Sequence, residues 1–180
     1  MHFELFRMKT VLKIIGVALL AAACQNPATN QESISEEEIQ IAKDLIQGAF
    51  DDLWGGVDST KISNYHTEDF IILEQGEIWD NERIKAYMRR QLAYPDRAKR
   101  INRMEYISID KYGPSIQIAY FNYAEFTRAD TLVGKASWLE SALAVPTKNG
   151  WRLKMMHSTG MRNWLDWLDR VDGRFMGSPL

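Results

Sequence analysis

Apolar residues recur at three- and four-residue spacing in the stretch that follows Ser35. This apolar face consists of Ile39, Ala42, Leu45, Ile46, Ala49, Phe50, Leu53 and Trp54. The spacing predicts an amphipathic helix of about four turns. Because Ser35-Glu36-Glu37-Glu38 has the form of a capping box, the helix is expected to begin after Ser35, and Gly55-Gly56 is expected to end it.

Two shorter helices and a hairpin are predicted next along the chain. Residues 58–65 indicate a short helix capped by Asp58 or Ser59. The turn signal Gln75-Gly76 separates two short β-prone runs, 70–73 and 77–79. Asp80 or Asn81 then begins a third helix, which Pro95 ends and whose apolar side is formed by Ile84, Met88 and Leu92.

The rest of the chain up to residue 159 has the pattern of long strands. Four strands are predicted, at Met104–Tyr112, Ser115–Thr127, Leu132–Val145 and Trp151–Thr159. Asn149-Gly150, between the last two, is a strong hairpin signal. Helices that precede a run of strands predict an α+β domain, in which three N-terminal helices pack against one face of a curved antiparallel sheet.

The first 23 residues are typical of a signal peptide, with Lys9 and Lys13 before the apolar run 14–20. The leader ends at Cys24, the only cysteine, and LLAAAC resembles a bacterial lipobox. The resemblance implies that Cys24 is lipidated and becomes the mature N-terminus, and Gln25 after it suggests the outer membrane of the cell envelope. The alternative is an ordinary secretory leader followed by a free thiol. The polar residues 24–35 then form a flexible tether to a domain at 36–160.

Composition supports a globular domain and excludes one class of partner. Apolar residues make up 46% and aromatic residues 11% of the chain, enough for a packed core. The net charge is −2, and no basic run is present, so we expect no nucleic-acid partner. Residues 161–180 contain a second amphipathic segment, with Trp164, Trp167, Leu168 and Val171 on one side, followed by a tail without a period.

Two segments resemble the nuclear transport factor 2-like superfamily, in its SnoaL-like and ketosteroid isomerase-like branches. They are YHTEDFIILEQGEIWDNERI (65–84) and NGWRLKMMHST (149–159), which place an acid at Asp69, a glycine turn at Gly76 and a histidine at His157. The resemblance implies a cone-shaped fold with a pocket between sheet and helices. Members of that superfamily include isomerases, dehydratases and non-catalytic binding domains, so fold likeness leaves the function open.

His157 is the first candidate for the predicted pocket. Strand alternation puts it on one face with Trp151, Leu153, Met155 and Thr159, and this more apolar face is expected to point inward. His157 is then either a pocket group, with Met155 beside it, or a buried neutral histidine that only supports the structure.

His66 and Asp69 are further candidates for acid–base chemistry. His66 ends the second predicted helix just before Asp69, and the resemblance to dehydratase-like members implies a pair of His66 with His157 or Asp69. The alternative is a helix-end histidine that interacts with the helix dipole or with Glu68.

The predicted strand 132–145 carries Trp138 and Glu140 on the same face as three alanines. Glu140 is either a pocket carboxylate with a raised pKa or an exposed charge at the rim, the more common place for a glutamate. Tyr120 and Asn122 on the preceding strand are candidates for hydrogen bonds to a ligand.

No cofactor or metal is expected. Two histidines and no further cysteine beyond residue 24 provide no metal-ligand spacing, and no phosphate-binding glycine loop is present. The strand 115–127 is apolar on both faces, which predicts that its outer face is covered, by a second copy in a homodimer or by residues 161–180.

Two functions remain open on the sequence alone. The first is a lipid-anchored domain that binds a small, largely apolar molecule or a partner protein. The second is an acid–base enzyme of dehydratase or isomerase type that uses His157 with His66, Asp69 or Glu140. Catalysis requires two titratable groups at one ligand site, whereas binding requires apolar walls and a polar anchor.

Overall fold

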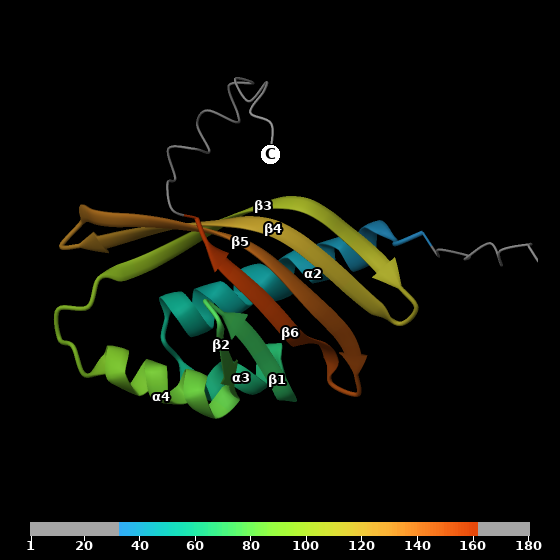
Figure 1. The fold of residues 1–180 in the computed structure, drawn as a ribbon, viewed down its shortest axis with the longest axis horizontal. Coiled ribbons are helices and arrows are strands. Elements are labelled where there is room, and N and C mark those ends of the chain that lie inside the picture. Colours follow the sequence, from blue (N-terminus) through green and yellow to red (C-terminus); the bar gives the residue numbers. More distant parts are fainter. Residues whose placement is uncertain (1–32, 162–180) are drawn as a thin grey trace, which may run out of the picture. The chain divides into compact units, whose positions relative to one another are not determined.

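The computed structural model describes residues 33–161. Cys24, the predicted signal peptide, nearly all of the tether and the C-terminal segment 162–180 lie outside the described residues. Within residues 33–161 the helices and strands follow the order expected from the sequence, with an α+β architecture (Figure 1). None of the helices in this range is long and apolar enough to span a membrane.

The helices begin at the polar residues that the sequence indicates. Ser35 caps α2 through a complete capping box with Glu38, and Asp80 caps α4 by accepting a hydrogen bond from the Arg83 amide. Asp58 caps the short helical segment that leads into β1. The helical elements are α2 (Glu36–Ala49), η1 (Phe50–Gly55), η2 (Ser59–Lys61), α3 (Ile62–Tyr65) and α4 (Asn81–Leu92).

The last turns of the first predicted helix are not α-helical. Over η1 the chain forms a π-helix, and the Gly56 amide donates to the Asp51 carbonyl five residues earlier at 2.7 Å. Such wide turns change which side chains share a face and are frequent beside functional sites. Here Phe50 and Leu53 are buried in the core, while Trp54 is half-buried.

Six strands form one mixed sheet in the order β2-β1-β6-β5-β4-β3. All neighbouring pairs are antiparallel except β1 and β6, which are parallel, so the prediction of a purely antiparallel sheet is wrong at this pair. The strands are β1 (His66–Glu74), β2 (Glu77–Asp80), β3 (Lys99–Tyr112), β4 (Ser115–Arg128), β5 (Thr131–Thr147) and β6 (Gly150–Gly160).

Both tight hairpin turns predicted from the sequence are present. Gln75 and Gly76 connect β1 to β2 with φ angles of 50° and 85°, and Gly150 has a φ of 91° at the β5–β6 turn. Glycine adopts this left-handed region without the steric cost that a side chain brings.

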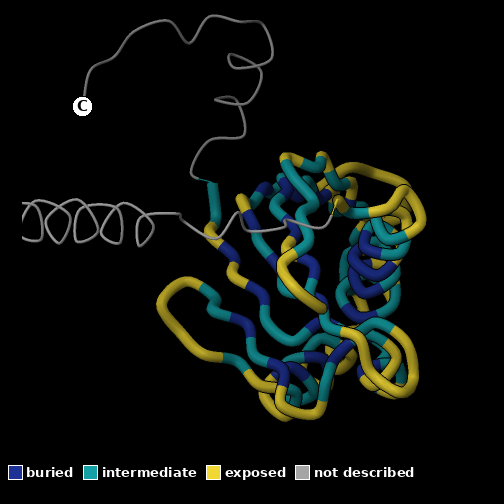
Figure 2. Tube along the Cα trace, turned by 90° about the vertical axis from the view of Figure 1, so that its right-hand side faces the viewer, coloured by how far each residue is buried: buried dark blue, intermediate teal, exposed yellow. Residues whose placement is uncertain are grey.

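The core lies between the helices and the inward face of the sheet, where the buried residues are concentrated (Figure 2). On β4 the inward positions alternate strictly and are fully buried, with Ile116, Ile118, Tyr120 and Asn122 each 0% exposed. Outward positions such as Phe121 and Tyr123 are half-buried. The sequence pattern of this strand therefore predicted its two faces correctly.

The prediction that His157 faces inward is wrong. Met155 pairs with Leu143 on β5 and Leu153 pairs with Ala144, so Lys154 is an extra residue in β6. A bulge of one residue shifts the alternation of the rest of the strand to the opposite face. As a result Met156 and Ser158 point into the core, and His157 is exposed on the outer face.

Candidate functional site

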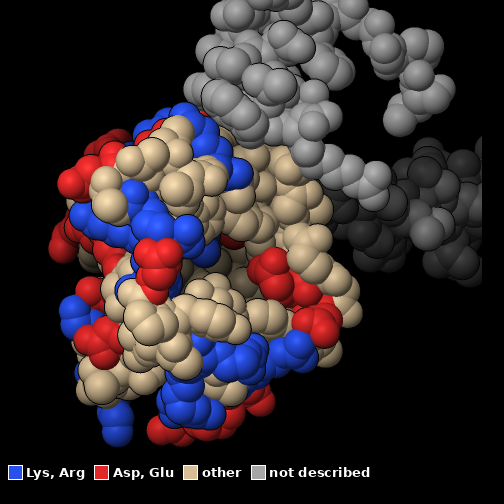
Figure 3. Space-filling view, turned by 90° about the vertical axis from the view of Figure 1, so that its left-hand side faces the viewer, with Lys and Arg blue, Asp and Glu red and all other residues tan. Residues whose placement is uncertain are grey.

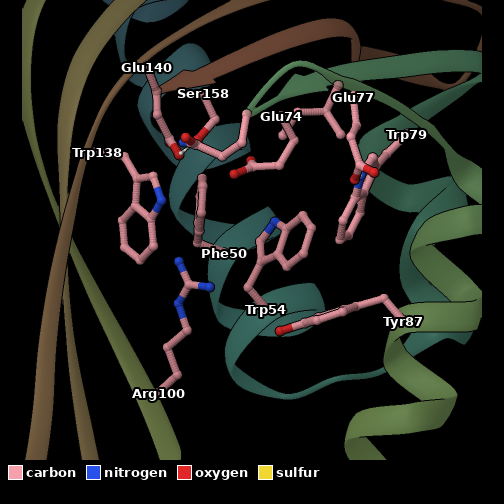
Figure 4. A pocket seen from close by; sticks show the side chains of 12 residues that line it. Phe50, Trp54, Glu74, Glu77, Trp79, Tyr87, Arg100, Trp138, Glu140 and Ser158 are labelled. Atoms are coloured by element: carbon pink, nitrogen blue, oxygen red, sulfur yellow. Dashed lines mark hydrogen bonds between the residues drawn. The ribbon is translucent and has the colours of Figure 1, made fainter. Parts of the chain in front are cut away.

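A cavity of about 310 Å³ lies between the inward face of the sheet, η1 and α4 (Figure 4). Its walls are mainly aromatic, and four charged side chains line it, Glu74, Glu77, Glu140 and Arg100. The lining residues are Phe50, Trp54, Ile72, Glu74, Gln75, Glu77, Trp79, Tyr87, Arg100, Trp138, Glu140 and Ser158. Figure 3 shows a hollowed face of the domain in which uncharged side chains form the floor between acidic and basic groups.

Strand register places the polar groups of the cavity in one row. Ser158 on β6 pairs with Glu74 on β1 and with Glu140 on β5, and Glu140 pairs in turn with Tyr120 on β4. Residues paired across neighbouring strands point to the same face of a sheet. The two carboxyl groups therefore stand on either side of Ser158, with Tyr120 behind Glu140.

Glu140 is buried, with 5% of its surface exposed. The hydroxyl of Ser158 donates to its Oε1 at 3.0 Å, and the amide of Asn122 donates to its Oε2 at 3.2 Å. Burial nevertheless raises the pKa of Glu140 to about 7, because removing a carboxylate from water costs more than these hydrogen bonds restore. The alternative that Glu140 is an exposed charge at the rim is therefore wrong. Glu140 is a buried carboxyl group of the pocket, which was the other alternative.

A chain of buried side chains supports Glu140 from behind. Arg100 Nε donates to Asn102 Oδ1 at 2.9 Å, and Asn102 Nδ2 donates to Asn122 Oδ1 at 2.6 Å. Asn122 in turn donates to Glu140. Tyr120 is fully buried and lies near enough to Glu140 to lower the pKa of that carboxyl group. The Tyr120 hydroxyl itself forms no hydrogen bond to any of the described residues.

Glu74 is the second carboxyl group of the cavity and is half-buried. Burial raises its pKa, while the neighbouring side chains of Ser158 and Gln75 and the positive charge of Arg100 oppose the shift. In Figure 4 its carboxylate points into the cavity toward Trp54. Two acids with raised pKa values thus face one cavity, which makes them candidates for functional groups.

Arg100 enters the cavity from the start of β3 and is surrounded by aromatic rings. Its guanidinium carbon lies 4.8 Å from the ring centre of Trp138, 5.7 Å from Phe50 and 6.0 Å from Trp54. These distances are in the range of cation–π interactions.

The remaining sequence candidates lie elsewhere or play a different part. Of the predicted ligand-binding residues, Trp138 lines the cavity, and Tyr120 and Asn122 lie behind Glu140. Met155 points to the outer face, because it precedes the buried Met156 after the bulge.

Asp69 is exposed and pairs with Lys154, which lowers the pKa of the aspartate. It pairs with neither histidine, because His66 begins β1 and His157 pairs with Leu73 near the far end of that strand. The structure therefore does not bring His66, His157 and Asp69 together as an acid–base group.

His66 is a buried residue that joins two elements. Its ring stacks on Phe70 at 3.7 Å, and Nδ1 lies 2.9 Å from Asn81 Oδ1. The Asn81 amide donates to the carbonyls of Thr67 and Glu68, which leaves Oδ1 as the acceptor for the histidine Nδ1–H. Burial lowers the pKa of His66 to about 4, so the ring is neutral and ties the start of β1 to the start of α4.

Glu74, Arg100, Trp54, Trp79 and Tyr87 were not identified as site residues from the sequence. Trp54 belongs to the helical face that looks like core, and Tyr87 and Trp79 meet it only in space, in a series of ring contacts with centres 5.8 Å and 5.6 Å apart. The one available signal was at Glu74, a charged residue that directly follows the apolar run 70–73 of β1. Residues 33–161 contain no group of three or more His, Cys, Asp and Glu side chains placed to hold a metal ion.

Comparison with known proteins defines the fold. No family model matches the sequence, and no curated protein matches it either. Among solved structures, the protein Aln2 from a Streptomyces species is similar, with a TM-score of 0.63 and 12% identity over 78% of this chain and 99% of that one.

Two further structures carry the name of the fold. A nuclear transport factor 2 (NTF2-like) superfamily protein from Salmonella enterica serovar Typhimurium aligns with a TM-score of 0.55 and 14% identity over 71% of this chain and 92% of that one. A ketosteroid isomerase-like protein from Erwinia carotovora atroseptica aligns with a TM-score of 0.53 and 11% identity over 72% and 100%. The chain therefore has an NTF2-like α+β fold, as its sequence motifs suggested, and likeness at this identity shows the fold alone.

Proposed function

We propose that this domain binds a small organic molecule, with a largely apolar body, in the aromatic cavity. The observation that supports this most directly is the convergence of Glu74, Glu140 and Arg100 on a cleft of about 310 Å³ with aromatic walls. Ligand sites have this composition, with apolar walls that provide affinity and a few polar groups that orient the molecule.

Removing an aromatic wall should weaken binding. We expect Trp54→Ala to lower the affinity for an aromatic probe such as 2-phenylethanol by about tenfold or more, because a stacked ring contributes on the order of 1 kcal/mol beyond its buried area. Isothermal titration calorimetry on the purified protein measures the change. Tyr112→Ala, at a residue 56% exposed outside the cavity, is the matched control and should leave the affinity unchanged. Equal affinity in both variants would contradict the proposed binding site.

Acid–base catalysis is the second candidate, and the pKa of Glu140 favours it. A carboxyl group that titrates near 7 can accept or donate a proton at neutral pH. Glu74, on the other side of Ser158, supplies the second titratable group that such chemistry needs. Catalysis differs from binding in one observable, a chemical change of the bound molecule, which NMR of the molecule during incubation detects.

We also propose that Cys24 carries a lipid that anchors the chain to the bacterial cell envelope. The lipobox-like LLAAAC and the polar residues after it support this. We expect the wild-type protein to fractionate with membranes and to incorporate a labelled fatty acid. Cys24→Ala should be unlabelled and either soluble or unprocessed. Membrane association that is unchanged in Cys24→Ala would rule the anchor out.

Finally, we propose that two copies associate through the outer face of the sheet. Phe121 and Tyr123 stack there with ring centres 6.2 Å apart, next to Ile107 and Leu139, which are 54% and 45% exposed. An apolar surface of this kind is typical of an interaction site. Light scattering should therefore give the mass of a dimer for the wild type.

The matched variants are Leu139→Glu on this face and Ile78→Glu on β2, where an equally apolar residue is 65% exposed. Leu139→Glu should dissociate the dimer, and Ile78→Glu should not. A wild-type monomer that stays monomeric after removal of residues 162–180 would contradict the proposal, since that segment is the other candidate cover.

A further inference from the structure

The charges that line the cavity do not balance. Glu77 at the mouth forms an ion pair with Arg83, so these two charges compensate each other. Inside, Glu74 and Glu140 face a single cation, Arg100. With both carboxyl groups ionised, these three side chains give the interior of the cavity a net charge of −1.

Within the part of the chain that the structure describes, neither carboxylate has a cation of its own. Among residues 33–161, Glu74 and Glu140 form no ion pair. Arg100 lies close enough to lower the pKa of both carboxyl groups. However, its Nε donates a hydrogen bond to Asn102, and its guanidinium lies against the ring of Trp138. A buried carboxylate without a paired cation costs free energy, which a positively charged partner would recover.

The aromatic walls of the cavity also favour a cationic ligand. The rings of Trp138, Phe50 and Trp54 already hold the guanidinium of Arg100 at 4.8 to 6.0 Å. From Trp54 the aromatic wall continues through Tyr87 to Trp79, on the side of the cavity away from Arg100 (Figure 4). Aromatic faces next to carboxylates are the features with which proteins recognise amines and quaternary ammonium groups.

We propose that the ligand of this cavity is an organic monocation: an amine or ammonium group that lies between Glu74 and Glu140, on an apolar or aromatic body that stacks on Trp54 and its neighbours. This inference rests on the proposed function, because it specifies the ligand class of the same cavity. An anionic ligand would have only Arg100 to bind it and would face two carboxylates.

Three probes of equal shape separate the ligand classes. Phenethylamine is cationic, 2-phenylethanol is neutral and phenylacetate is anionic at neutral pH. By calorimetry on the full-length protein at about pH 8, we expect phenethylamine to bind about tenfold tighter than the alcohol, and phenylacetate to bind most weakly. Glu140→Gln and Glu74→Gln should each reduce the ratio of amine affinity to alcohol affinity by about threefold, because the two carboxylates share the preference. Asp69→Asn, which removes an exposed carboxylate outside the cavity, should leave the ratio unchanged.

The amine should also release protons when it binds. Glu140 faces Tyr120 on β4, Arg100 on β3 and Glu74 beyond Ser158, and a bound cation adds a positive charge that lowers its pKa. Calorimetry at about pH 6.5 in buffers of different ionisation enthalpy should detect the release of a fraction of a proton with phenethylamine. That release should be absent for 2-phenylethanol and reduced in Glu140→Gln.

The outcomes distinguish the inference from the proposed function. If the alcohol binds as tightly as the amine and Trp54→Ala weakens both, the cavity binds small molecules but the cation preference is wrong. If phenylacetate binds most tightly, Arg100 determines the ligand charge and the inference is also overturned. If none of the three probes binds at millimolar concentration, the binding function itself is contradicted.

Discussion

Replacing Glu140 with glutamine is expected to stabilise the folded domain relative to the wild type at about pH 8, and to lose this advantage near pH 4.5. The folded pKa of Glu140 is about 7, against 4.5 for an unperturbed glutamate, so between these values the folded state holds a proton that the unfolded state has released. The contribution of Glu140 to stability is therefore fully present below the unfolded pKa and is lost as the pH rises through 7. The difference corresponds to about 3 kcal/mol.

Glutamine preserves the shape of the site and removes the charge. Its side-chain oxygen and amide can still meet Ser158 and Asn122, which are the partners of the carboxyl group. Urea unfolding of both proteins at several pH values gives the difference in unfolding free energy. His66, with its pKa lowered to about 4, destabilises the fold as the pH falls below 6.5, but it does so in both proteins and cancels in the difference.

The control for this prediction is Glu68→Gln, at an exposed carboxyl group on β1. As for most exposed substitutions, its unfolding free energy at about pH 8 should lie within about 0.5 kcal/mol of the wild-type value. A Glu140→Gln protein whose stability also runs parallel to that of the wild type would mean that Glu140 titrates normally. In that case the carboxyl group is in contact with water and the account of the cavity is wrong.

Asn122→Leu is expected to destabilise the domain by about 3 kcal/mol. Asn122 is fully buried and connects Asn102 to Glu140, so a leucine of similar size leaves the Asn102 amide and one carboxylate oxygen without partners. An unsatisfied buried polar group costs on the order of 1–3 kcal/mol. The loss of this hydrogen bond should also raise the pKa of Glu140 further.

A control on the same strand separates this effect from the general cost of a polar-to-apolar change. Gln117→Leu lies on the exposed face of β4 and should change the unfolding free energy by less than about 0.5 kcal/mol. The effect of Asn122→Leu should be smaller by at least about 1 kcal/mol when Glu140 is replaced by methionine, because one of the two unsatisfied groups is then absent. Strict additivity of the two substitutions would show that the hydrogen-bond chain is not coupled.

Local features of this protein could be predicted because short-range physics determines them. The capping box at Ser35 and the turns at Gln75-Gly76 and Asn149-Gly150 involve residues that are neighbours in the chain. The alternation along β4 groups Ile116, Ile118 and Tyr120 on one face without reference to any other strand, although both faces are apolar and the sequence does not say which one is buried. These signals together were sufficient for the α+β fold.

The prediction for β6 failed at a single extra residue. Alternation gave the correct inward position of Leu153, but the bulge at Lys154 arises from the pairing of β6 with β5 and β1, whose registers are not written in β6 itself. One residue was enough to move His157 from the expected pocket to the exposed face and to bring Ser158 inward.

The sequence by itself determined the type and order of the main elements and the candidates Glu140, Tyr120, Asn122 and Trp138 on one face of two neighbouring strands. Only the tertiary structure decided that Glu140 is buried, that Glu74 joins it across Ser158, and that Arg100 enters from β3. The physical reason is that burial and pKa depend on what packs against a side chain. Here the groups around Glu140 come from β3, β4 and β6, and η1 and β1 supply other walls of the same cavity, so its surroundings exist only when the sheet and the helices have come together.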